Sequence, residues 1–128
     1  ASPADAVRGL LALQAQDLPG ALWSVGLRSG ATQQQVVAAH EAGGFVRSWP
    51  LRGALHLVAP DDLPWLLDLA GARAMTSAEG RHRRLGLEAA DFARSERIAL
   101  RLLDGATSTR AQLLAAFEAE GLSTAGQR

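Results

Sequence analysis

The sequence predicts a mainly α-helical protein with a small β-hairpin, an α+β fold. Over most of the chain, apolar residues recur at the three- and four-residue spacing of amphipathic helices, in segments that begin at capping residues and end near glycine. Between residues 45 and 58 this spacing gives way to short runs rich in β-branched and aromatic residues. With 48% hydrophobic residues in 128, the chain can form a buried core.

The first third of the chain predicts three helices. Ser2-Pro3-Ala4-Asp5 has the residues of a helix start, because serine caps, proline takes the first helical position and the acid can close a capping box. Apolar residues from Val7 onward continue this helix to about Gln14. Thr32 opens a similar pattern. We therefore expect helices at about residues 3–14, 21–30 and 33–43.

The change of spacing predicts a hairpin. Phe45–Trp49 and Ala54–Val58 are short and partly alternating, as strands are. They flank Pro50–Gly53, which is short enough to form a tight connection.

The second half of the chain predicts helices again. Ala59–Asp62 caps a helix that leads into an arginine-rich stretch, Arg73–Gly86, which looks mobile. An amphipathic helix follows at residues 88–104, and another begins at Ser108–Ala111 and stops at Gly121. Ser123-Thr124 would cap one more helix.

The order of these elements predicts a tandem architecture. Residues 3–58 run helix, helix, helix, hairpin, which is the layout of a winged helix-turn-helix. Residues 88–128 repeat the start of that order, so we expect a second, truncated copy. The expected parts are a first winged-helix motif at 1–59, a connecting helical segment at 60–87 and the start of a second motif at 88–128. We expect a fragment of a longer protein that is inactive alone.

The residue composition excludes several kinds of functional site. The chain has no cysteine, which excludes disulfides, thiolate catalysis and cysteine metal sites. Its three histidines lack metal-ligand spacing, so we expect neither metal nor cofactor. The formal net charge is zero, and all 13 basic residues are arginine, a side chain suited to phosphate. No membrane-length apolar run or signal peptide is present, so we expect a soluble, cytoplasmic protein associated with the nucleoid.

Three stretches carry a resemblance to a known family, and together they cover nearly the whole chain. They are LLALQAQDLPGALWSVGLR, VRSWPLRGALHLVAPDDLPWLL and STRAQLLAAFEAEGLSTAGQR. The chain resembles the bacterial winged-helix proteins that include the AlkZ/YcaQ-type DNA glycosylases. In the glycosylase members, a glutamine–apolar–glutamine or glutamine–apolar–aspartate motif carries the chemistry. The matching positions are Gln14, Ala15 and Gln16. The resemblance implies double-stranded DNA as partner and alkylated bases, including interstrand crosslinks, as substrate.

The two glutamines impose a geometric condition and a chemical limit. On a continuous helix, residues two apart point about 200° away from each other and cannot share one water. If the helix breaks between Leu13 and Asp17, the side chains of Gln14 and Gln16 can converge. Two amides can orient a water but cannot protonate a leaving base, so the base must be activated already, as in N7-alkylated purines.

Each of these residues also has a simpler interpretation. Gln14 and Gln16 can be exposed amides at a helix end. Asp17 can supply a base or merely cap the next helix. If the glutamines are dispensable, the chain is a non-catalytic winged-helix DNA-binding protein such as a transcriptional regulator, or a protein-interaction module.

Further candidate DNA contacts are basic. Arg52 and His56 can lie near DNA phosphates or the reacting sugar, or else form a hairpin tip and its solvent face. Arg81, Arg83 and Arg84 can bind phosphate, or else form a solvated face.

The tryptophans have two interpretations as well. They can stack on an unpaired base, but each lies in an apolar pattern, so we expect core packing. They are Trp23, Trp49 and Trp65.

Overall fold

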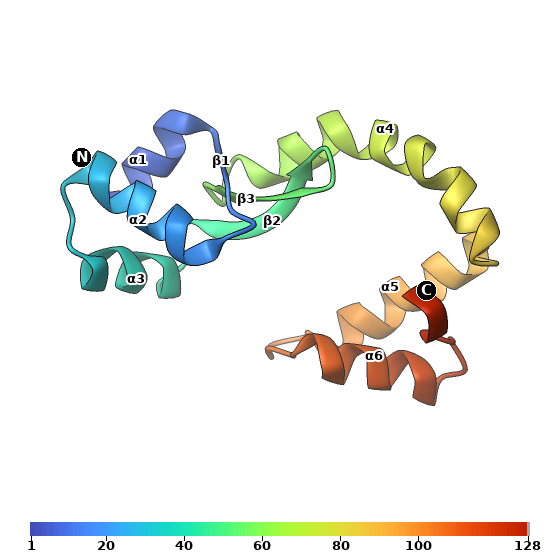
Figure 1. The fold of residues 1–128 in the computed structure, drawn as a ribbon. Helices are drawn as coiled ribbons and strands as arrows, with labels where there is room; N and C mark the ends of the chain where they lie inside the picture. Colours follow the sequence, from blue (N-terminus) through green and yellow to red (C-terminus); the bar gives the residue numbers. More distant parts are fainter. Residues whose placement is uncertain (128) are drawn as a thin grey trace. The chain divides into compact units, whose positions relative to one another are not determined.

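The computed structural model describes residues 1–127, which form two compact units, Ala1–Thr76 and the part from Ser77 onward. The first unit contains three helices, three strands and the start of a fourth helix (Figure 1). These are α1 (Pro3–Leu10), β1 (Ala12–Gln14), α2 (Leu18–Ser29), α3 (Gln33–Glu41), β2 (Val46–Leu51), β3 (Ala54–Val58) and α4 (Leu63–Arg84). The second unit contains the end of α4, α5 (Ala89–Leu102), α6 (Arg110–Ala119) and a 3-10 helix, η1 (Ala125–Gln127). The chain is mainly helical with a small antiparallel sheet, so the α+β prediction is confirmed.

Helix α1 begins as predicted but ends early. Ser2 Oγ accepts a hydrogen bond from Asp5 N–H, and Asp5 Oδ2 accepts one from Ser2 N–H, which closes the capping box. The helix stops because Leu11 has a φ of 62°, in the left-handed region. The prediction that this helix reaches Gln14 is therefore wrong. Residues 12–14 instead pair with β3, a distant partner that local sequence patterns do not reveal.

The sheet places β3 between β1 and β2, and both pairings are antiparallel. Gln14 lies opposite His56, and on the other side of β3 Ser48 lies opposite the same histidine. Because partners in register project to the same face, the side chains of these three residues share one face of the sheet.

The predicted hairpin is present, with a shorter turn than expected. Strand β2 continues to Leu51, which pairs with Ala54, so only Arg52 and Gly53 form the turn. Their φ angles are 52° and 66°, as a type I′ turn requires. The register of β2 is irregular between Ser48 and Leu51, where Pro50 has no N–H to donate.

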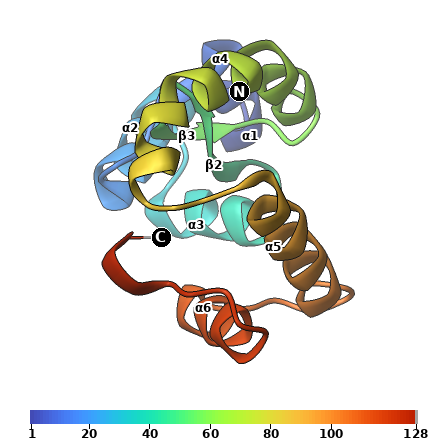
Figure 2. The same cartoon turned by 90° about the vertical axis from the view of Figure 1, so that its right-hand side faces the viewer.

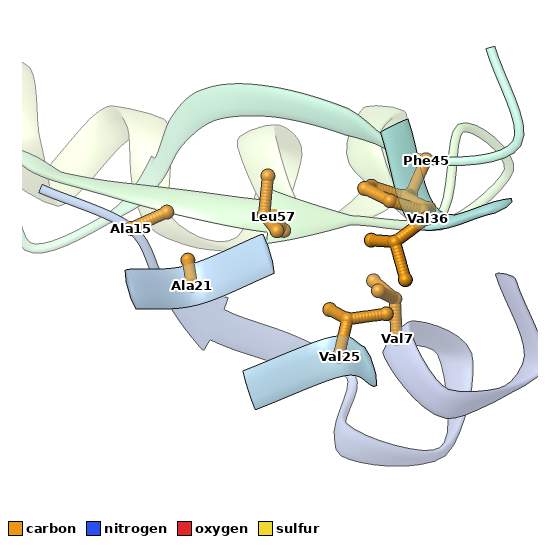
Figure 3. Close-up of a cluster of buried hydrophobic side chains, with 7 residues drawn as sticks. All are labelled: Val7, Ala15, Ala21, Val25, Val36, Phe45 and Leu57. Carbon is orange, nitrogen blue, oxygen red and sulfur yellow. The ribbon is translucent and has the colours of Figure 1, made fainter. Parts of the chain in front are cut away.

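The core of the first unit lies between the sheet and the first three helices (Figure 3). Its buried side chains are Val7, Ala15, Ala21, Val25, Val36, Phe45 and Leu57. The tryptophans do not join it. Trp23, Trp49 and Trp65 are 69%, 61% and 44% exposed, so the expectation of core packing is wrong. Small and β-branched residues fill the space instead.

The second unit is built from helices with local caps. Helix α4 continues to Arg84, so most of the arginine-rich stretch Arg73–Gly86 is helical. Helices α5 and α6 pack side by side (Figures 1 and 2). The predicted start of α6 is confirmed, because Thr109 and Gln112 form a capping box. The structure of Arg128 lies outside the described residues.

Among residues 1–127, no helix combines the length and the apolar character that crossing a membrane requires.

Candidate active site

Gln14 is the last residue of β1, and Gln16 lies in the bend that follows this strand. Both are exposed, while Ala15 between them is only 1% exposed and belongs to the core. This alternation places Ala15 against the core and leaves both glutamines exposed to solvent. The helix ends at Leu10, before the motif, so neither glutamine lies on a continuous helix, and their convergence on one water stays a prediction.

Arg47 of β2 holds this segment, and sequence reasoning missed it. Its Nε–H donates to Ala15 O at 2.9 Å, and its Nη2–H donates to Gln16 O at 2.9 Å. Ala15 N–H also donates to Leu55 O at 2.7 Å. The main chain of the motif itself, at Ala15 and Gln16, is thus fixed by hydrogen bonds from β2 and to β3. The sequence offered only an arginine within a strand pattern as a signal, because the pairing of Arg47 with buried Leu57 is known from the structure alone.

Asp17, the carboxylate nearest in sequence, caps α2. Its side chain accepts a hydrogen bond from Gly20 N–H at 3.2 Å. A Cβ atom at Gly20 would lie 2.5 Å from Asp17 Oδ2, so the cap geometry depends on the glycine. Of the two roles predicted for Asp17, a base or a helix cap, the structure shows the helix cap.

His56 lies in the middle of the sheet. It is 4% exposed, and its Nδ1 is 2.8 Å from Ala54 O. The alternative of a solvent-exposed histidine is wrong: His56 is buried although it shares its face of the sheet with the exposed Gln14, because the unpredicted strand β1 makes β3 a central strand. Its predicted role in contacting DNA stays a prediction.

The predicted basic contacts fall in both units. Arg52 is exposed at the hairpin turn of the first unit. Arg81, Arg83 and Arg84 are exposed on the last turn of α4, in the second unit. His82 between them packs its ring against Phe92, with ring centroids 4.9 Å apart. The structure thus brings Gln14, Gln16 and His56 together in one unit, and the arginine cluster is a separate surface.

An apolar groove adjoins the motif along the chain. It has a volume of about 650 Å³ and is lined by residues of α2, α3 and the turn between them. Its walls include Leu18 and Pro19, which directly follow Asp17, and the exposed Trp23. The tryptophan that was expected in the core therefore lines a surface groove.

These features define a class: a small α+β protein that presents paired amides on a clamped strand end, beside a buried histidine. Comparison with models of known protein families identifies the family of this chain. The family model described as DNA glycosylase AlkZ-like matches residues 7–128. The chain therefore belongs to the AlkZ-like DNA glycosylase family, as the resemblance indicated. Neither the curated proteins nor the solved structures gave a match to this chain.

Proposed function

We propose that the full-length protein is a DNA-repair glycosylase that hydrolyses the N-glycosidic bond of N7-alkylated bases in double-stranded DNA, including crosslinked ones. Gln14 and Gln16 position the attacking water. The observation that supports this proposal is the exposure of both glutamines on a hydrogen-bonded segment, within a chain of a DNA glycosylase family.

The chemistry follows from what an amide can do. Each side-chain oxygen accepts a hydrogen bond from the water and turns the negative end of its dipole toward the reacting sugar. Glycosidic cleavage passes through an oxocarbenium-like state, which that dipole stabilises. Neither amide can protonate a leaving group. A cationic N7-alkylated purine needs no protonation, because it leaves as a neutral base.

We propose that the first unit is a winged helix that binds DNA. Support comes from the element order α1, β1, α2, α3, β2, β3, in which a helix pair precedes a two-stranded wing, with Arg52 at the wing tip. In the proposed tandem arrangement, α5 and α6 begin a second copy. Arg81, Arg83 and Arg84 add phosphate contacts, which make DNA affinity salt-dependent.

A base-release assay with the full-length protein tests this function. Duplex DNA carrying N7-methylguanine is incubated with wild type, with the double variant Gln14→Ala/Gln16→Ala and with the control Gln34→Ala, an exposed glutamine on α3. We expect release by wild type and the control, and a loss of about 100-fold or more in the double variant. Full release by the double variant contradicts the role of the glutamines. No release by wild type, together with a footprint at one DNA sequence, favours the non-catalytic regulator.

A further inference from the structure

We propose that His56 accepts the proton of the water that Gln14 and Gln16 position. This inference rests on the proposed glycosylase function and names the base that two amides and a capping carboxylate leave unassigned. It is carried by the strand register, by the burial of the imidazole and by the hydrogen bond that sets its tautomer.

The register brings His56 and Gln14 close together. In antiparallel pairs, hydrogen-bonded and non-hydrogen-bonded residue pairs alternate along the ladder. Ala15 N–H donates to Leu55 O, which makes Ala15 and Leu55 a hydrogen-bonded pair. Gln14 and His56, one step along, are therefore a non-hydrogen-bonded pair, the kind with Cα atoms about 4.5 Å apart and side chains nearest each other.

The tautomer of His56 leaves a free acceptor. A carbonyl oxygen can only accept, so the contact with Ala54 O places the proton on Nδ1. Nε2 of the neutral ring then carries a lone pair. No buried side-chain nitrogen or oxygen among residues 1–127 lacks a hydrogen-bond partner. Since the hydrogen bond of His56 is made by Nδ1, Nε2 keeps contact with solvent on the face that carries Gln14.

The proton transfer balances the reaction. The water oxygen bonds to C1′ of the sugar as the bond from C1′ to the base nitrogen breaks. The bonding pair leaves with the cationic base, which becomes neutral. The water proton moves to Nε2, and the resulting imidazolium carries the positive charge that the base has lost. Nδ1–H stays bonded to Ala54 O and holds the ring in place.

Few charged groups face this imidazole. Its register partners on the neighbouring strands, Gln14 and Ser48, do not titrate. Arg47 of β2 lies in register with Leu57 and so belongs to the opposite face of the sheet. On α1, which also contacts β3, the charged residues Asp5 and Arg8 form their own ion pair. A dependence of the chemical step on pH therefore reports on His56.

The test compares two matched variants in single-turnover release of N7-methylguanine by the full-length protein. His56→Asn keeps an N–H donor for Ala54 O but has no group at the Nε2 position. Asp17→Asn keeps the cap of α2 but removes the carboxylate. We expect His56→Asn to lose about 10²- to 10⁴-fold in rate with DNA affinity unchanged, and Asp17→Asn to stay within about threefold of wild type.

The pH profile supplies a readout that a purely structural histidine would not change. In wild type the rate should fall as the pH is lowered, because a protonated imidazole cannot accept the proton of the water, and this fall should be absent in His56→Asn. A wild-type rate that does not change with pH overturns the assignment, even if His56→Asn fails to fold. So does a His56→Asn variant with wild-type rate and profile, or a large loss in Asp17→Asn alone. Absence of release by wild type instead rejects the glycosylase proposal itself.

Discussion

At the residue scale, the arrangement of the Gln14–Gln16 motif depends on residues that lie far from it in the sequence. Arg47 lies more than thirty positions from the two carbonyls that it binds, and His56 lies opposite Gln14 only because β1 adds to the sheet. The glutamine pair itself was predictable, because both residues and their spacing are local. Arg47 and the burial of His56 were not, because both follow from the pairing of strands that no short stretch of sequence specifies.

Replacing Arg47 should loosen the motif. In Arg47→Met the carbonyls of Ala15 and Gln16 lose their donors, and we expect a loss of about 1–3 kcal/mol in the free energy of unfolding. Base release should fall further than DNA affinity, because the amides lose their fixed position. Urea unfolding and single-turnover assays measure the two effects. Arg47→Lys, which can replace one bond, should lie between Met and wild type, and equal behaviour of Lys and Met would contradict the clamp.

At the element scale, most helix starts follow from capping residues that can be recognised in the sequence. The capping boxes of α1 and α3 were visible as pairs of residues three apart, and both are present. The start of α6 was predicted too, and its capping box is seen in the structure. The left-handed Leu11 that ends α1 was not visible, because leucine rarely takes that conformation and the apolar spacing continues past it. In α4 the apolar spacing stops before the helix does. The arginine-rich part of this helix lacks an apolar stripe, but no proline interrupts it before the helix ends at Arg84.

The cap of α2 leads us to predict an unusual effect of Gly20→Ala on stability. Alanine normally stabilises a helix relative to glycine by about 0.5–1 kcal/mol. Here the new Cβ would lie 2.5 Å from Asp17 Oδ2, so Gly20→Ala should displace the carboxylate and lose the cap. We expect net destabilisation in wild type but stabilisation when the same change is made in Asp17→Ala. Thermal unfolding of the four proteins in this cycle measures the sign, and an equal effect in both backgrounds would contradict the steric argument.

The hairpin turn offers a separate test. Arg52 is held at a φ of 52°, a conformation that asparagine tolerates better than arginine. Arg52→Asn should raise the free energy of unfolding by up to about 1 kcal/mol. If the tip meets DNA phosphate, the same variant should bind duplex DNA more weakly and with a shallower salt dependence. Unchanged salt dependence would remove Arg52 from the DNA surface while leaving the turn argument intact.

At the scale of the whole molecule, the two units are held by different means. The first has a hydrophobic core between sheet and helices, whereas the second relies on helix packing and on polar contacts near its end. In each unit, a carboxylate among residues 1–127 has a lowered pKa. In the first, the side chain and then the main chain of Ser2 donate to Asp5. In the second, the hydroxyl and then the main-chain N–H of Thr124 donate to Glu118.

These two carboxylates predict how acid acts on each unit. A pKa that is lower in the folded state stabilises the fold above the unfolded-state value, and the contribution disappears as pH falls through the folded-state value. The ordinary values are 4.5 for Glu118 and 3.8 for Asp5, so the second unit should begin to lose this contribution at a higher pH than the first. Thr124→Val removes the hydroxyl donor and serves as the matched variant. We expect the difference in stability between wild type and Thr124→Val to be constant from pH 7 to about 5 and to shrink below pH 4.5. Amide hydrogen exchange of residues in α6, followed at several pH values, measures this difference, and a gap that stays the same at pH 3 would show that Glu118 is not the group responsible.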